Sequence, residues 1–383
     1  MENTPEGTPE STPESTPENT PENTPIKHTR HKEYSLAAAA LAAVMLLLVG
    51  IPQSLLLLLV VNIISIASIL YSAFSVIRHA DVLAHRYGEP YGSLILSLAI
   101  TILEVGLIST LMLTGSAGAT MMRDTIYSVV LIVMSGFIGF ALLMGGRKYR
   151  SQSFNFTGIK HFLISIIPLA AIVLVLPTAL GNGGAYNALQ KAVVALCCVL
   201  MYIYFLRIQT VTHRKFFVFE DEDEDAHHHG MPSTHSSAWH FLLLGIHLVA
   251  VIGVTKLNSA ALDSLLQNLG APAGITGFLV ALLILSPEGA GAFKSILENQ
   301  VQRAMNLLLG SVLATISLTV PVIIVVAALT GQELVMGLDI PSIVLMLCTF
   351  LVCQTSLTGG RTNAHSGAAH VVLFLTYLML LFS

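Results

Sequence analysis

The sequence predicts an all-α polytopic membrane protein with about 11 transmembrane helices, one N-terminal helix plus two inverted five-helix repeats. Three observations predict it. The 383 residues are 54% hydrophobic and 10% charged, with a mean hydropathy of +0.77, whereas soluble domains carry about 25% charged residues. Apolar runs of spanning length recur along the chain. Lys and Arg gather in alternate connections between these runs.

The N-terminal segment differs from the rest of the chain. It repeats TPE five times between Thr4 and Glu22. Proline at every fourth position, among Glu, Ser and Asn, leaves nothing to bury in a core. Residues 1–33 are therefore predicted to be a disordered cytosolic tail, and the segment lacks the cationic start and short apolar stretch of a secretory signal. An extra N-terminal helix is expected over 34–53.

Eleven apolar runs are separated by Gly, Pro and charged residues, and each is a candidate span. They lie at 36–52, 54–77, 91–113, 125–146, 161–180, 187–206, 238–256, 273–293, 303–328, 338–358 and 368–382.

The basic residues orient these spans. With the N-terminus inside, cytosolic segments hold 15 of the 18 Lys and Arg residues, and the external side keeps Arg123, Lys191 and Lys256. Because cytosolic loops carry an excess of basic residues, the N-terminus is expected to face the cytosol.

A cytosolic loop over 207–237 divides the chain. Its six successive acids, Glu220 to Asp225, precede three histidines at 227–229. A like-charge block is typical of a solvated, mobile segment, and a weak divalent-cation or regulatory site is the alternative. Five spans lie in 54–206 and five in 238–383. Since an odd number of crossings separates equivalent spans, the second half runs inverted relative to the first, as in secondary transporters.

Two of the 22 Asp and Glu residues stand apart from the others. Seven lie in the N-terminal segment, six in the acidic run and seven at loops or span edges. Glu104 and Glu288 remain, each in the second span of its half. A carboxylate at the centre of a membrane helix costs at least ~2.5–3.5 kcal/mol. The symmetric placement favours a functional role for both acids over packing alone.

Polar and small residues accompany the two acids. Thr101 shares a helix face with Glu104, and the flanking Pro287 and Gly289 predict a broken helix with free carbonyls at Glu288. Hydroxyl residues recur in the following spans, at Ser135 in the first half and at Ser311, Thr315 and Thr319 in the second. We expect a cation site built from Glu104, Glu288, Ser311, Thr101, Ser135 and Thr315.

Oxygen ligands without central His or Cys favour a hard cation, and two carboxylates suit one Ca²⁺ ion. The same pair can bind protons instead. If cation and protons compete for one site, either occupant lowers the cost of moving the site across the barrier, while the empty, doubly charged site is held back. This mechanism is antiport.

The stretches around the acids match a known pattern. The first half contains HADVLAHRYGEPYGSLILSLAITILEVGLI and RDTIYSVVLIVMSGFIGFALLMGG, and the second contains LSPEGAGAFKSILENQVQRAMNLLLGSVLATISLTVPV. They resemble the two α-repeats of bacterial calcium/proton antiporters in the cation/calcium exchanger superfamily, over roughly residues 70–383. The resemblance implies exchange of cytosolic Ca²⁺ for external H⁺, with Glu104 and Glu288 coordinating the cation and Ser311 in the second repeat's Gly-Ser pair.

The sequence departs from the calcium-selective branch of that superfamily before each acid. Gly-Asn usually precedes each Glu there, whereas Ile100-Thr101 and Ile284-Leu285 stand at those places here. Because the site then has fewer amide oxygens for Ca²⁺, a monovalent Na⁺ or K⁺/H⁺ antiporter remains the alternative.

Two other function classes fit the sequence less well. A cation channel would not require an opposing proton gradient. An enzyme is not expected: PSTHSS in the loop is similar to a stretch of membrane lipid phosphatases, but the Arg partners that would hold phosphate are missing. The expected partners are Ca²⁺, H⁺ and the lipid bilayer, with no nucleic acid and no cofactor. The expected location is the inner (plasma) membrane.

Overall fold

The computed structural model describes residues 33–88, 91–114, 118–217, 235–272, 274–357 and 359–382. Within these residues, ten helices are long and apolar enough to cross a membrane, and a shorter apolar helix, α1, precedes them. The predicted all-α polytopic fold is confirmed. The disorder predicted for 1–33 and the acidic run 220–229 fall outside the described residues, except for Glu33.

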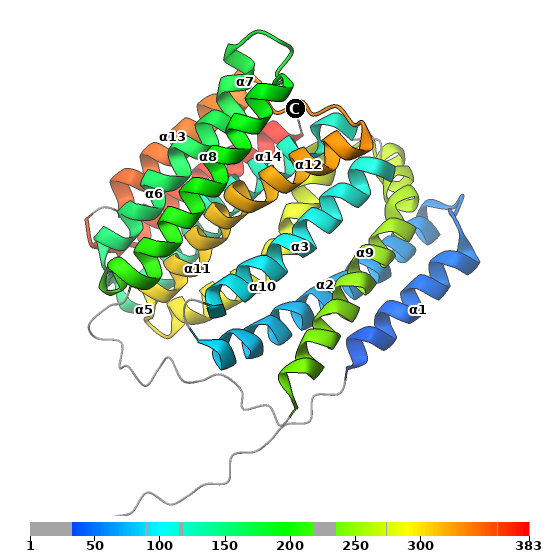
Figure 1. Ribbon diagram of the computed structural model, residues 1–383, viewed down its shortest axis with the longest axis horizontal. Coiled ribbons are helices and arrows are strands. Elements are labelled where there is room, and N and C mark those ends of the chain that lie inside the picture. Colours follow the sequence, from blue (N-terminus) through cyan, green and yellow to red (C-terminus); the bar gives the residue numbers. More distant parts are fainter. Residues whose placement is uncertain are drawn as a thin grey trace, which may run out of the picture.

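Within the described residues, four spans contain a π-helical segment. Figure 1 shows the arrangement of the helices. In chain order they are α1 (Tyr34–Val49), α2 (Leu55–Tyr87), α3 (Tyr91–Thr114), α4 (Met121–Leu131) with η2 (Ile132–Phe137) and α5 (Ile138–Tyr149), α6 (Phe156–Ala170) with η3 (Ala171–Val175) and α7 (Leu176–Ala179), α8 (Ala188–Arg207) with η4 (Ile208–Thr212), α9 (Ser237–Asn268), α10 (Gly274–Leu297), α11 (Val301–Ala314) with η7 (Thr315–Thr319) and α12 (Val320–Thr330), α13 (Ile340–Leu357), and α14 (Ala364–Leu381).

Two helices are longer than their apolar runs predict. The run 54–77 belongs to α2, which continues to Tyr87, and the run 238–256 belongs to α9, which continues to Asn268. Lys256, expected in an external loop, therefore lies within α9. The extension of α2 is amphipathic: Ala80 and Leu83 are buried while Asp81 is exposed. A helix of this kind continues past the point where mean hydropathy falls, because one face still packs on a neighbour.

The first helices of the two halves, α2 and α9, pack along each other in opposite directions (Figure 1). Near the start of α2, Asn62 donates to the carbonyl of Ala261, and near its end Arg86 donates to that of His235. Rising residue numbers in α2 thus meet falling numbers in α9. The halves are inverted relative to each other, as five crossings between them require.

One end of the bundle collects the connections that the charge bias assigns to the cytosol. β1 (Ser151–Ser153) pairs antiparallel with β2 (Arg361–Asn363), joining two connections far apart in sequence. Gln152 donates to Asn299 at 2.8 Å, and Asn306 donates to the carbonyl of Phe217 at 2.6 Å. These contacts place the connections near 152, 217, 299 and 361 on the same side.

The opposite end collects the connections assigned to the exterior. Backbone bonds join Val335 to Ala119 at 3.0 Å and Met336 to Gly184 at 2.8 Å. Arg123 donates to the carbonyl of Gly337 at 3.2 Å. The relative sidedness predicted from the basic residues therefore agrees with the packing.

Candidate functional site

Glu104 and Glu288 lie at nearly the same depth in equivalent helices. Glu104 is the 14th residue of the 24-residue α3, and Glu288 is the 15th of the 24-residue α10. Their exposed fractions are 1% and 4%. At 1.5 Å per residue, both carboxyl groups lie about 20 Å along their helices. A depth this close to the middle of a ~30 Å hydrocarbon core is where uncompensated charge is most costly.

Hydroxyl groups of one span serve both acids. Thr319, in η7, donates to Oε2 of Glu104 at 2.5 Å, and Thr315, one turn earlier, faces the same carboxyl group. Ser311, at the end of α11, donates to Oε2 of Glu288. The hydroxyl residues that recur every fourth position in this span therefore face the two acids. The hydrogen bond from Thr319 links the acid of the first repeat to a span of the second repeat.

The site has unused bonding capacity. Within the described residues, Oε1 of Glu104 is buried without a hydrogen-bond partner, and so is the hydroxyl of Ser317 in η7. The carboxyl groups of Glu104 and Glu288 are close enough for the charge of one to act on the other. Buried polar atoms usually have hydrogen-bond partners. The unpaired Oε1 of Glu104, with the carboxyl group of Glu288 nearby, can therefore bind a cation or a proton.

The spans that follow α3 and α10, which hold the predicted hydroxyl ligands, each contain a π-helical segment. η2 holds Ser135 and η7 holds Thr315 to Thr319. Such segments are rare inside α-helices and frequent at functional sites, because they shift side chains and free backbone groups. The sequence does not reveal them, since they leave the apolar pattern unbroken.

The remaining predicted ligands differ in what they contact. The hydroxyl of Ser135 is buried and donates to the carbonyl of Leu131 in its own helix. Thr101 is buried on α3, three residues before Glu104. The structure thus brings Ser311, Thr315 and Thr319 to the acids. It leaves Thr101 beside Glu104 along the helix and Ser135 bonded to its own backbone.

The predicted helix break at Glu288 is wrong. α10 runs unbroken from Gly274 to Leu297 through Pro287. A proline removes one N–H and can be accommodated in a membrane helix packed by its neighbours. Gly289 has a packing role instead, because a Cβ there would lie 2.6 Å from Cε2 of the Phe137 ring in η2. The glycine lets α10 approach η2 closely.

No sequence signal singles out His370, which lies on α14 and contacts the π-helical segment η2. Its Nδ1 lies 2.7 Å from the carbonyl oxygen of Met134, in η2, and its Nε2 lies 2.8 Å from the hydroxyl of Ser356. Because a carbonyl only accepts, Nδ1 carries the proton and Nε2 accepts from the hydroxyl. The buried imidazole thus satisfies a backbone group within the π turn.

Comparison with known proteins decides the family. The family model described as sodium/calcium exchanger protein matches residues 57–211 and 239–383. The chain belongs to the sodium/calcium exchanger family. The two matched segments are the two inverted halves, and the gap between them contains the acidic run.

Relatives within the family carry two kinds of name. The sodium-potassium/proton antiporter ChaA of Escherichia coli K12 is 56% identical over 93% of this chain and 98% of its own length. A Ca(2+)/H(+) antiporter of Aphanothece halophytica is 27% identical over 74% of this chain and 76% of its own.

Solved structures show the same fold. The structure of native YfkE superposes with a TM-score of 0.71 at 18% identity, covering 91% of this chain and 98% of that one. The H+/Ca2+ exchanger CAX gives 0.66 at 14% identity, covering 90% and 88%. These structures confirm the predicted fold, and the family match over 57–211 and 239–383 confirms the predicted superfamily.

Proposed function

We propose that this protein is a secondary active antiporter that exchanges cytosolic cations for external protons at Glu104 and Glu288. The observation that carries the proposal is the pair itself. Two buried carboxyl groups, at equivalent depths in inverted repeats, interact with each other and accept hydrogen bonds from one hydroxyl-lined span. The membership of the chain in an exchanger family supports the same activity.

Charge balance at the pair explains the coupling. With both carboxyl groups ionised, the empty site carries two negative charges, which are costly to move through the hydrocarbon core. One Ca²⁺, two protons, or one monovalent cation with one proton each cancel that charge. If only neutral forms of the site cross, one Ca²⁺ exchanges for two protons and one Na⁺ or K⁺ for one. Both exchanges are electroneutral.

Ca²⁺ is favoured by the two carboxylates. It accepts six to eight oxygens, including carboxylates, and its charge matches the pair without help from a proton. The relative from Aphanothece halophytica is named a Ca(2+)/H(+) antiporter.

Na⁺ or K⁺ is the second candidate. It is favoured by the 56% identity to a sodium-potassium/proton antiporter over nearly the whole chain. The lack of amide side chains at Thr101 and Leu285, which leaves a ligand set dominated by hydroxyls, also favours it. The two candidates use the same acids, so they compete.

The orientation is part of the proposal. The end of the bundle near 152, 299 and 361 carries most of the basic residues, so it is assigned to the cytosol by the positive-inside rule. The N-terminus then faces the cytosol and the protein lies in the inner membrane. A reporter fused after Ser237 should read as cytosolic, and an external reading would overturn this orientation.

Proton flux in inverted membrane vesicles tests the activity. Vesicles containing the protein are acidified inside, and Ca²⁺, Na⁺ and K⁺ are added in turn while a fluorescent dye follows lumenal pH. Each transported cation should release protons, whereas vesicles without the protein should not respond. Clamping the membrane potential at zero should leave the rate unchanged if exchange is electroneutral. Absence of release with all three cations would contradict the proposed function.

A further inference from the structure

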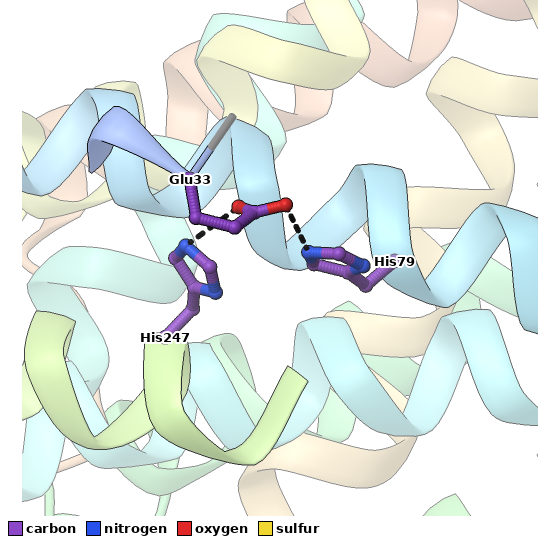
Figure 2. Close-up of side chains that lie close together, drawn as sticks. All are labelled: Glu33, His79 and His247. Atoms are coloured by element: carbon purple, nitrogen blue, oxygen red, sulfur yellow. Dashed lines mark ion pairs between the residues drawn. The ribbon is translucent and has the colours of Figure 1, made fainter. Parts of the chain in front are cut away.

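A second cluster of ionisable groups lies outside the exchange site, where α1 begins. Glu33 precedes α1, His79 lies on α2 and His247 on α9, and the three side chains converge (Figure 2). Oε1 of Glu33 is 3.5 Å from Nε2 of His79, and Oε2 is 3.5 Å from Nε2 of His247. Both imidazoles are buried, and the carboxylate side chain is 19% exposed. Three segments far apart in sequence thus present one ligand atom each, all within 4.8 Å of one another.

The surroundings of His247 fix its tautomer. Its Nδ1 lies 2.8 Å from the carbonyl oxygen of Leu243, which can only accept, so Nδ1 carries the proton. Nε2 then holds a lone pair, which accepts from the hydroxyl of Ser35 at 2.8 Å. A backbone carbonyl on the far nitrogen is the contact that orients metal-binding histidines.

His79 is oriented by a neighbouring imidazole instead of a backbone carbonyl. Its Nδ1 lies 2.9 Å from Nδ1 of His240. Its Nε2 lies 3.5 Å from a guanidinium nitrogen of Arg78, which can only donate. When the Nδ1 proton of His79 is donated to His240, a lone pair remains on Nε2. In this state the Nε2 lone pairs of both histidines are available to a metal ion beside the Glu33 carboxylate, which on His247 would take the place of the Ser35 hydroxyl.

The spacing matches a known coordination geometry. Two ligand atoms about 2.0–2.1 Å from a tetrahedral Zn²⁺ ion are about 3.3 Å apart. Oε1 of Glu33 lies 3.5 Å from Nε2 of His79, close to this value, and Oε2 lies 3.5 Å from Nε2 of His247. One ligand atom from each of the three residues lies within 4.8 Å of the other two, so a small shift brings all three to one ion. Imidazole nitrogens suit Zn²⁺ and similar borderline metals, whereas Ca²⁺ and Mg²⁺ prefer oxygen ligands.

We propose that Glu33, His79 and His247 bind a borderline divalent metal ion of the Zn²⁺ class, which ties the start of α1 to α2 and α9. The three-residue set leaves a fourth tetrahedral position for water. The site selects a different class of cation from the exchange site, and the inference does not depend on the exchange activity.

Arg78 affects the affinity of this site for a metal ion. Its guanidinium donates to Oε2 of Glu33 at 2.7 Å. Oε1 can bind a metal while Oε2 keeps this bond, which orients the carboxylate. The positive charge of Arg78 also opposes a nearby cation, so the affinity should fall below that of a closed structural zinc site.

Metal binding by the purified full-length protein tests the proposal. The three histidines at 227–229 are first replaced by Ala, because such a run binds metal by itself. After chelator treatment, the protein is loaded with Zn²⁺, desalted and analysed for metal content. His79→Ala and His247→Ala should each lose the bound equivalent. His85→Ala is the matched control, since His85 lies on α2 with an exposed side chain paired to Asp81, and it should retain the equivalent.

Three further measurements distinguish loss of the metal site from misfolding. Zn²⁺ should raise the melting temperature of the control and not that of His79→Ala, because a ligand stabilises only a protein that binds it. Glu33→Gln lies outside the spans and should lower the Zn²⁺ affinity at least tenfold without loss of folding. Co²⁺ loaded in place of Zn²⁺ should give the intense visible absorption of a four-coordinate ion. No bound equivalent in the starting protein, or equal metal content in His79→Ala and His85→Ala, would overturn the proposal.

Discussion

Replacing Thr319 by Val removes the hydrogen bond that links the two repeats at the exchange site. Thr319 donates to Glu104 at 2.5 Å, and both residues are buried. Val keeps the branched shape of Thr but lacks the hydroxyl. A hydrogen bond to a charged group contributes about 1.5–3 kcal/mol, which corresponds to about 10- to 150-fold in a binding constant. The half-saturating cation concentration should rise by that factor, because the Thr319 hydroxyl no longer holds the Glu104 carboxylate and no longer offers an oxygen to the ion.

The assay is cation-dependent proton release from vesicles containing equal amounts of each protein. Thr330→Val is the matched control, since Thr330 lies on the continuous helix after η7 and its hydroxyl bonds the carbonyl of Val326 at 2.8 Å. This control should match the unmodified protein within twofold. If Thr319→Val also stays within twofold, Thr319 does not act in the site and the reasoning from its contact with Glu104 is refuted.

Three further results are expected. Gly289→Ala should lower the melting temperature in detergent and slow exchange, because its Cβ would meet Phe137 at 2.6 Å and overpacking costs about 1–3 kcal/mol. Gly253→Ala, with open space around its Cβ, is the control and should change neither quantity. Equal effects of the two substitutions would contradict the packing role. His370→Ala should destabilise the protein by about 1–3 kcal/mol, because the carbonyl of Met134 loses its donor; an unchanged melting temperature would show that the bond is dispensable. Raising the pH should lower the half-saturating cation concentration by up to about tenfold per pH unit for each proton displaced, and a pH-independent value would exclude competition at one site.

The sequence predicts the fold well, and it points to the two acids, because both depend on local, additive signals. The hydropathy of each run predicts its span, and α3 begins at Tyr91 as expected. Glu104 and Glu288 are conspicuous because a carboxylate within an apolar run has few explanations. Thr315 and Ser311 follow from their helical spacing, which is also local.

The features that the sequence misses depend on tertiary packing. The proline at 287 predicts a break only if no neighbour holds the helix straight. The lengths of α2 and α9 depend on the packing of each helix's C-terminal extension against the other helix. Glu33 and His247 are separated by more than half the chain, and no periodicity links them. His370 meets the carbonyl of Met134 only because α14 packs on η2.

The central claim is that Glu104 and Glu288 together bind the cation in one half-cycle and protons in the other. The most direct test is cation-driven proton release by Glu104→Gln and Glu288→Gln, since Gln keeps the volume and one oxygen but cannot ionise. Glu298→Gln, at an exposed acid after α10 paired with Lys294, is the matched control. Both site variants should insert normally and release no protons with Ca²⁺, Na⁺ or K⁺, while the control exchanges at the unmodified rate. Exchange at the unmodified rate by either site variant would contradict the account.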